Sequence, residues 1–363
     1  MMTNLLITFG GMALLVFGGD LMVRGASALA KSLGISPLAV GLTVVAFGTS
    51  APELAVSIGA ALNGSSTLAF GNIFGSNLAN IGLIIGLSAL IRPLPIDGAV
   101  TRRELPMMIL AVAAATIMAN DAHLDGEALM YSRSDGLILL LFFVVFMYYT
   151  VGDLIAQRTA THRHAGGRYP DASTVYPAES TSAQLDAGAT DKGTKTIDTP
   201  GFDTDGKADD QRKSKRHVLE ILIGLGALLL GAHFTVDGGI AIARAMGISE
   251  VIIGLTMISI GTSLPELVAT LSAVRRGELA IAVGGVVGSN IFNILLVCGL
   301  TSTILPITIP PLGPTDLAFT GLLSLALLLT ARTHSRLILR WEGAGLLVSY
   351  LAYMVWRTLP PSA

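Results

Sequence analysis

Charged residues are scarce in this sequence of 363 residues. Asp, Glu, Lys and Arg make up 13% of the chain, about half of the ~25% that is usual in soluble domains. Residues 157–216 alone hold 10 of the 23 Lys and Arg and 9 of the 25 Asp and Glu, so the remainder is poorer still. This scarcity argues against a soluble globular protein.

Cysteine is also nearly absent. The single Cys298 lies in an apolar run, where a buried thiol behaves as a small hydrophobe, and one cysteine excludes an intrachain disulfide. The sequence has no basic nucleic-acid signature, so we expect no nucleic-acid partner. We also expect no cofactor. The run after Asn4 has no basic region before it and no small-residue cleavage site, and we expect a retained first helix rather than a signal peptide.

Long apolar runs fill most of the chain, which is 52% hydrophobic. A helix needs about 20 residues to cross a hydrocarbon core of ~30 Å. Runs such as Ile81 to Ile91 do not alternate between apolar and polar residues, which excludes a transmembrane barrel. We therefore predict an all-α membrane protein with ten transmembrane helices, at residues 4–31, 38–62, 67–91, 104–119, 135–156, 217–245, 251–275, 279–305, 314–331 and 337–357.

The hydrophilic residues 157–216 divide the chain into two parts of five spans each. This segment has almost no large apolar residues, a composition that cannot bury a core. We predict a first five-helix repeat at 1–156, a disordered cytosolic linker at 157–216 and a second five-helix repeat at 217–363.

The two parts are duplicates. A shift of 213 residues aligns Gly41 to Ile96 with Gly254 to Ile309 without a gap, and 24 of the 56 positions are identical. Because each copy has an odd number of spans, the second copy must enter the membrane from the opposite side. The repeats are therefore predicted to be inverted.

Basic residues give the orientation, because cytoplasmic loops accumulate Lys and Arg. With both termini outside, the inner segments hold 20 basic residues, and the outer segments hold only Arg133, Arg244 and Arg357. We predict a multi-pass protein of the plasma (inner) membrane with a cytoplasmic 157–216 loop.

Each copy carries an acidic motif near the middle of its second span. The motifs read GTSAPE at residues 48–53 and GTSLPE at residues 261–266. An ionisable group at the bilayer centre costs about 2.5–3.5 kcal/mol even on the lenient insertion scale, and it is a functional candidate by default. Glu53 and Glu266 are therefore the main candidates for a binding site.

The residues around each glutamate are typical of an interrupted helix. Ser50 and Ser263 are placed to cap the second half-helix, with proline in its first turn and the glutamate completing a capping box. A purely capping role for the two glutamates is the alternative. An interrupted helix exposes carbonyls only where they line a cavity, and the carbonyls of Ala46, Thr49, Ser259 and Thr262 would point at the bound species. Carbonyl and carboxylate oxygens suit a hard cation.

The turns after these spans predict which residues face the glutamates. Counting outward from each turn places Ser76 opposite Glu53 and Ser289 opposite Glu266. Asn80 and Asn293 follow these serines by four residues and therefore share their helix face. The two carboxylates supply a charge of −2, which matches one Ca²⁺ or offsets Na⁺ ions.

The paired GTSxPE and GSNxxN segments, in two inverted halves around a hydrophilic loop, resemble the alpha repeats of the sodium/calcium exchanger family of the calcium/cation antiporter superfamily. The resemblance implies electrogenic exchange of Na⁺ for Ca²⁺ by alternating access. It also implies sliding of the long first and sixth helices. The ligands that it implies are Glu53, Glu266, Thr49, Ser50, Thr262, Ser263, Ser76 and Ser289, the carbonyls of Ala46 and Ser259, and Asn80 and Asn293.

Neither Asn80 nor Asn293 is acidic, unlike the matching position in some family members, so we predict exchange that is independent of K⁺. An H⁺/Ca²⁺ antiporter of the same fold stays open as the alternative. A channel is disfavoured because the halves are inverted repeats, and an enzyme because no nucleophile and base accompany the carboxylates. The expected partners are Ca²⁺, Na⁺ and the lipid bilayer, and a monomer would suffice.

Overall fold

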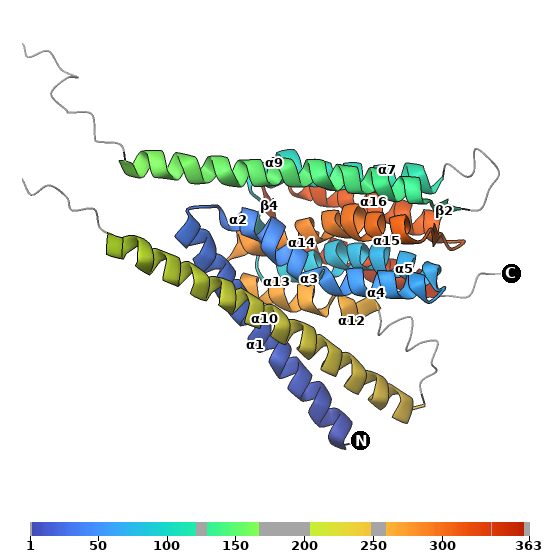
Figure 1. The fold of residues 1–363 in the computed structure, drawn as a ribbon. Coiled ribbons are helices and arrows are strands. Elements are labelled where there is room, and N and C mark those ends of the chain that lie inside the picture. The colour runs from blue at the N-terminus through green and yellow to red at the C-terminus, as the bar shows by residue number, and fades with distance from the viewer. Residues whose placement is uncertain (1, 121–128, 167–203, 248–258, 335, 359–363) are drawn as a thin grey trace, which may run out of the picture.

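The structure is a computed structural model that describes residues 2–120, 129–166, 204–247, 259–334 and 336–358. Helices occupy the positions of the expected spans, apart from residues outside these ranges. In the described part, seven helices are long and apolar enough to cross a membrane. The protein is thus an all-α membrane protein (Figure 1).

The first half contains α1 (Met2–Leu33), α2 (Pro37–Val40), the π-helical η1 (Gly41–Val45), α3 (Ala46–Thr49), α4 (Ala51–Leu62), α5 (Ser66–Leu78), the π-helical η2 (Ala79–Ile85), α6 (Gly86–Ile91), β1 (Leu94–Pro95), the π-helical η3 (Val100–Glu104), α7 (Leu105–Ala119), β2 (Met130–Tyr131) and α9 (Arg133–Gly166).

The second half contains α10 (Thr204–Ala245), α12 (Ser259–Thr262), α13 (Leu264–Arg276), α14 (Leu279–Phe292), the π-helical η6 (Asn293–Cys298), α15 (Gly299–Ile304), β3 (Ile307–Thr308), α16 (Gly313–Thr330), β4 (Leu337–Ile338) and α17 (Arg340–Thr358).

Prolines define where several helices begin. Pro37, Pro52, Pro106, Pro265 and Pro314 each occupy the first or second position of a helix, where the missing N–H is not needed and the fixed φ suits the helix. At the other end of α13, Gly277 ends the helix with φ of 76°, the left-handed conformation that favours glycine.

The two helical segments that carry the GSNxxN motifs form the centre of the bundle. In their most apolar stretches, 78% of the Ser66–Ile91 segment and 94% of the Leu279–Ile304 segment are buried, against 33% for α1 and 17% for Arg133–Ala156 of α9. Phe9 on α1 and Leu141 on α9 are exposed. Large apolar side chains exposed in this way are suited to contact with lipid.

Three expected boundaries differ from the structure. Helix α9 continues to Gly166 and α10 begins at Thr204, so both ends of the segment predicted to be a disordered linker are helical. Residues 167–203 lie outside the described residues, and their disorder stays a prediction. The last span was expected from residue 337, but residues 337–338 form β4 and the helix begins at Arg340.

Two short sheets join the halves reciprocally. Strand β1, which follows the third span of the first half, pairs with β4, which precedes the last helix of the second half. Strand β3 occupies the place of β1 in the second half, and it pairs with β2 of the first half. The sheets lie toward opposite ends of the bundle (Figure 1).

Glycines allow α1 and α10 to pack backbone to backbone along one flank (Figure 1). They recur every seven residues, at Gly11, Gly18 and Gly25 on α1 and at Gly224, Gly231 and Gly238 on α10. A Cβ on Gly18 would lie 2.6 Å from the amide nitrogen of Leu228 and 2.7 Å from the carbonyl oxygen of Gly224. Small residues are the ones that permit such close helix contact in membranes.

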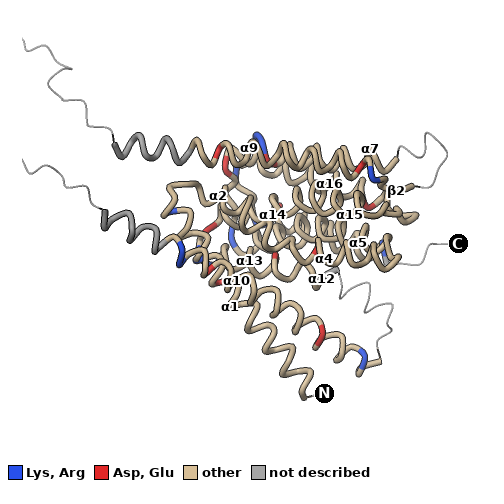
Figure 2. Tube along the Cα trace, viewed as in Figure 1, with Lys and Arg blue, Asp and Glu red and all other residues tan. Residues whose placement is uncertain are grey.

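The charged residues lie mostly toward the ends of the helices (Figure 2). The long middle portions of the helices are almost entirely tan, which marks uncharged residues. This is expected for segments inside a bilayer, where charge is costly. Glu53 and Glu266, in the second span of each half, are exceptions: they lie within the helical bundle and are only 0% and 3% exposed.

Candidate ion-binding site

Each GTSxPE motif interrupts its helix at a single serine. Ser50 separates α3 from α4 and Ser263 separates α12 from α13, which places each glutamate in the first turn of the helix that follows. Ser50 and Ser263 occupy the N-cap position of the second half-helix as expected, but the expected side-chain capping is wrong, because neither hydroxyl makes a capping hydrogen bond. Both serines have ψ close to zero, at 0° and 1°, rather than the extended conformation typical of an N-cap.

The interruption leaves some backbone carbonyls without their usual donors. Pro52 has no N–H, so the carbonyl of Gly48 loses its helical partner. The carbonyl of Ala46 accepts hydrogen bonds from the amide of Ser50 at 3.0 Å and from the hydroxyl of Thr49 at 3.5 Å, so the interruption does not free it. Ser259 is the first residue of α12, and the residues directly before it lie outside the described ranges. The role of its carbonyl therefore stays a prediction.

A chain of hydroxyls connects the two halves at Glu53. Ser263 Oγ donates to Ser76 Oγ at 3.2 Å, and Ser76 Oγ donates to Glu53 Oε1 at 3.3 Å. The expected position of Ser76 opposite Glu53 is therefore confirmed. Helices α4 and α5 of the first half meet the junction of α12 and α13 at this point.

The corresponding residues of the other copy are arranged differently. Ser289 is fully buried, and its hydroxyl lies 3.4 Å from the hydroxyl of Thr49; its expected position opposite Glu266 stays a prediction. Within the described residues, neither carboxylate oxygen of Glu266 has a hydrogen-bond partner. The carboxylates of Glu266 and Glu53 lie close enough to interact electrostatically.

Asparagines from the two halves pair reciprocally. Asn80 Nδ2 donates to Asn290 Oδ1 at 3.3 Å, and Asn293 Nδ2 donates to Asn77 Oδ1 at 3.2 Å. The repeat shift of 213 residues converts one pair into the other. Each bond uses the amide nitrogen of Asn80 or Asn293 and leaves its Oδ1 available to a ligand.

Both of these asparagines stand at the start of a π-helical segment. Asn80 is the second residue of η2, and Asn293 is the first residue of η6. A π-turn inserts one extra residue and occurs often at functional sites. The wider turn changes the direction of side chains that a regular helix would fix.

The buried oxygens of this region are of the chemical types that bind a hard cation. Across the described ranges, six buried side-chain oxygens without a hydrogen-bond partner belong to these motifs: Ser50 Oγ, Glu53 Oε2, both carboxylate oxygens of Glu266, Asn80 Oδ1 and Asn293 Oδ1. Buried polar atoms normally have partners. Oxygen ligands with two carboxylates are what Ca²⁺ and Na⁺ bind, and Ca²⁺ takes six to eight of them.

No group of three or more His, Cys, Asp and Glu side chains occurs in the part of the chain that the structure describes. The arrangement is thus two acids among neutral oxygens. Such a set offers no nitrogen or sulfur ligand, and it is poorly suited to zinc or copper.

Sequence reasoning missed three buried asparagines of this region: Asn72, Asn77 and Asn290. Asn77 and Asn290 fix the amides of Asn293 and Asn80, as described above. The signal was present, because Asn72, Ser76 and Asn80 recur every four residues and must share a helix face.

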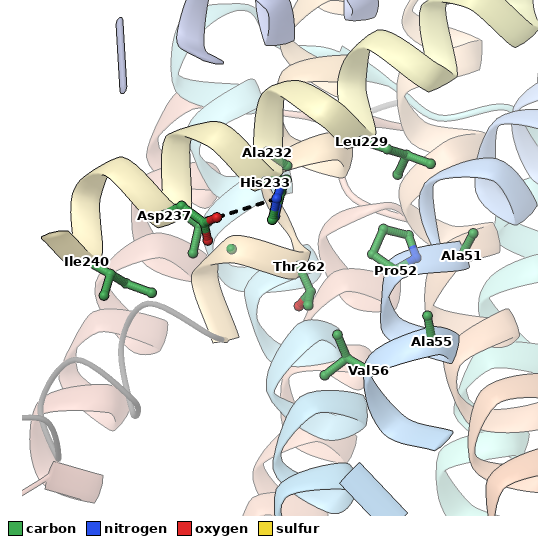
Figure 3. Close-up of a pocket in the computed structure, with 12 residues that line it drawn as sticks. Ala51, Pro52, Ala55, Val56, Leu229, Ala232, His233, Asp237, Ile240 and Thr262 are labelled. Carbon is green, nitrogen blue, oxygen red and sulfur yellow. Dashed lines mark ion pairs between the residues drawn. The ribbon is translucent and has the colours of Figure 1, made fainter. Parts of the chain in front are cut away.

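A partly open cavity of about 660 Å³ reaches the site between α4, α10 and α12 (Figure 3). Pro52 and Thr262 are among its lining residues, and an ion pair of His233 and Asp237 at 3.4 Å lies on its α10 wall. The remaining lining residues are apolar or glycine. The cavity therefore gives one side of the motif region access to the surface.

Comparisons with known proteins agree on one family. The sequence profile of the sodium/calcium exchanger protein family matches residues 3–152 and 217–359. The chain is similar to the sodium/calcium exchanger MaX1 of Methanosarcina acetivorans, at 31% identity over 97% of both chains. It is also similar to a putative antiporter, CaxA, of Alkalimonas amylolytica, at 35% identity over 94% of this chain and 95% of that protein.

Among solved structures, the sodium-calcium exchanger NCX_Mj matches with a TM-score of 0.76 and 27% identity, over 98% of this chain and 99% of that one. The two halves matched by the profile are the two halves that carry the acidic motifs. The chain is a cation antiporter that belongs to the sodium/calcium exchanger family.

Proposed function

We propose that this protein exchanges Na⁺ for Ca²⁺ by alternating access at the site built from Glu53 and Glu266. The observation that carries the proposal is the set of six buried, unpartnered oxygens where the two halves meet. Desolvating carboxylates without a partner is costly, and bound cations would offset that cost. The name of MaX1 as a sodium/calcium exchanger supports the same assignment.

The proposed architecture is ten transmembrane helices in two inverted five-helix repeats. The reciprocal pairing of β1 with β4 and of β3 with β2 supports this symmetry, and so do the reciprocal asparagine pairs. In the orientation given by the basic residues, both termini lie outside the inner membrane and residues 157–216 lie in the cytoplasm. The two halves together complete the site, so a monomer suffices and no cofactor is needed.

The contacts of α1 and α10 suggest which side of the site is accessible. On the proposed cytoplasmic side, α1 is held to the second half by an ion pair of Asp20 with Arg276, and by a 2.5 Å hydrogen bond of Ser27 to Glu278. On the other side, the cavity of Figure 3 separates α10 from α4. We therefore assign this structure to a state in which ions enter from outside.

Transport in this scheme involves movement of α1 and α10 along each other. The glycines of their contact remove the side chains that would otherwise interlock. In the opposite state, the contacts of Asp20 and Ser27 would open, and the cavity beside Thr262 would close. Exchange of one Ca²⁺ for three or more Na⁺ moves net charge and would make the cycle electrogenic.

Potassium is not expected to take part. Glu53 and Glu266 supply two formal charges, which one Ca²⁺ neutralises. A monovalent ion beside Ca²⁺ would add a repulsion on the order of several kcal/mol at an effective dielectric near 20. The neutral side chains of Asn80 and Asn293 offer no further charge to offset it.

An H⁺/Ca²⁺ antiporter remains the second candidate, because two neighbouring buried carboxylates can also carry protons. The similar protein CaxA is named a putative antiporter, with no coupling ion in its name.

The deciding experiment is Ca²⁺ uptake by purified protein in liposomes preloaded with Na⁺, compared with liposomes given only a pH gradient. Uptake that needs internal Na⁺, and that responds to membrane voltage, supports the proposal. Uptake driven by the pH gradient alone would replace it with proton coupling. Replacing K⁺ with a large inert cation, under a voltage clamp that does not depend on K⁺, should leave the rate unchanged.

A further inference from the structure

Met108 connects α7 with the pair formed by Asn80 and Asn290. Its side chain is fully buried, and its Sδ accepts a hydrogen bond from Nδ2 of Asn290 at 3.5 Å. Oδ1 of Asn290 in turn accepts a hydrogen bond from Nδ2 of Asn80 at 3.3 Å. The chain of bonds ends at Oδ1 of Asn80, which is buried and has no partner within the described residues. One line of side chains thus joins α7 and α14 to η2.

The direction of each bond in this chain follows from the chemistry of the sulfur. A carboxamide has a donor end and an acceptor end of nearly the same shape, whereas a thioether sulfur can only accept. The nitrogen of Asn290 therefore faces Met108, because an oxygen there would meet the sulfur without a proton between them. The oxygen of Asn290 then faces Asn80 and engages its nitrogen. Asn80 keeps its oxygen for a cation, which a reversed amide would instead meet with N–H groups.

The equivalent pair of asparagines has no such acceptor in the described part of the chain. Oδ1 of Asn77 accepts a hydrogen bond from Nδ2 of Asn293 at 3.2 Å. Nδ2 of Asn77, however, is buried without a hydrogen-bond partner among the described residues. The bond to the sulfur of Met108 therefore distinguishes the two pairs, and it comes from a helix outside both of them.

We propose that Asn290 and Met108 are positioning residues for cation binding: Met108 sets the orientation of the Asn290 amide, and Asn290 turns the side-chain oxygen of Asn80 to the ion. This inference rests on the proposed function, because it assumes that the site binds Ca²⁺ and that Asn80 is a ligand. Loss of a partner that orients a metal ligand typically lowers affinity by about 10–100-fold. Asn290→Ala should weaken Ca²⁺ binding by that factor and raise the KM for Ca²⁺, with a smaller effect on kcat.

The test is a pair of double-mutant cycles in the full-length protein, because such cycles measure whether one residue acts through another. Equilibrium binding of Ca²⁺ is measured in Na⁺-free buffer at constant pH for wild type, Asn290→Ala, Asn80→Ala and the double variant. If Asn290 acts through Asn80, the double variant binds Ca²⁺ about as weakly as Asn80→Ala alone. In an Asn293→Ala background, Asn290→Ala should keep its full effect. Damage to the helix of Asn290 would instead couple it to Asn293, three residues away on the same segment.

Met108→Leu tests the first link of the chain. The exchange conserves volume, which cores tolerate well, but it removes the acceptor. It should weaken Ca²⁺ binding less than Asn290→Ala does, and it should cause no further loss when Asn290 is already alanine. Met107→Leu is the matched control, because Met107 lines a separate cavity beside Phe146 and Tyr149, and it should bind Ca²⁺ as wild type does.

Three outcomes overturn the inference: unchanged Ca²⁺ affinity in Asn290→Ala, losses that simply multiply in the double variant with Asn80→Ala, or Met108→Leu that binds Ca²⁺ as Met107→Leu does. Asn290→Ser replaces the alanine variant if the latter does not fold, as judged by gel filtration and thermal melting. Asn80→Ser, which has a hydroxyl but no amide to orient, replaces Asn80→Ala if that variant binds too weakly to measure. A wild-type protein that binds no Ca²⁺ would refute the proposed function itself, whereas failure of the cycles alone refutes only the positioning roles.

Discussion

The two copies of the acidic motif have nearly the same sequence but different surroundings. Glu53 accepts a hydrogen bond from Ser76, and its backbone carbonyl accepts one from Asn72. Both carboxylate oxygens of Glu266 are buried without a partner within the described structure. Two nearly identical motifs thus differ in the hydrogen bonds made to their glutamates.

The same contrast extends to the long helices. Asp20 on α1 is paired with Arg276 of the second half. The residue equivalent to Asp20 is His233 on α10, and it lies on the wall of the open cavity (Figure 3). The halves therefore also differ in the contacts that α1 and α10 make.

Replacing either carboxylate tests whether the halves are equal in ion binding. Glu53→Gln and Glu266→Gln should each reduce exchange by roughly 100-fold or more, because a lost charge leaves Ca²⁺ under-neutralised where the effective dielectric is low. The measurement is Na⁺-driven Ca²⁺ uptake at matched protein amounts, with thermal melting as the folding control. Near wild-type transport in either variant would exclude that glutamate from the site.

Blocking the contact of α1 with α10 tests whether the long helices distinguish the halves. Gly18→Leu should destabilise the protein by about 1–3 kcal/mol or more, as overpacked cores do, and should abolish transport. Gly10→Leu on the same helix is the control, because a Cβ on Gly10 meets no described atom within 4 Å. Equal Tm and equal transport for the two variants would show that the contact does not matter.

Adding a third carboxylate to the candidate ion site tests the assignment of two formal charges, from Glu53 and Glu266, to that site. Asn293→Asp should change ion preference or the pH dependence of transport by severalfold without abolishing Ca²⁺ binding. A third carboxylate beside Glu53 and Glu266 favours an additional cation or a proton. Asn80→Asp is its counterpart in the first half, and a different response of the two variants would measure how unequal the halves are. Loss of all Ca²⁺ binding in both variants would contradict the prediction.

Removing the connection between the halves should have the smallest effect. Deletion of residues 167–203 is expected to leave the rate of exchange within about twofold of wild type, because a segment without a hydrophobic core contributes little to the membrane fold. Uptake is compared at equal amounts of inserted protein. A well-expressed deletion variant without transport would show that the loop is a structural or regulatory element.

Much of the fold could be predicted from the sequence. The helices lie within a few residues of most expected spans, since the length of an apolar run is set by the thickness of the bilayer. Turn counting placed Ser76 against Glu53, and the bond of 3.3 Å confirms it. Ser50 lies at the predicted N-cap position, but the predicted side-chain cap was wrong, because Ser50 keeps near-helical dihedral angles.

The sequence by itself determined the class of protein, the duplicated halves and the two glutamates of the equivalent motifs. These follow from local quantities: hydropathy, the 213-residue repeat and the cost of charge in a bilayer. Only the tertiary structure decided that the Glu53 carboxylate accepts a hydrogen bond from Ser76. The Glu266 carboxylate has no hydrogen-bond partner within the described residues. Asn77, Asn290 and Asn72 act across the boundary between the halves. A hydrogen bond between residues about 200 positions apart depends on how helices pack, which no local pattern records.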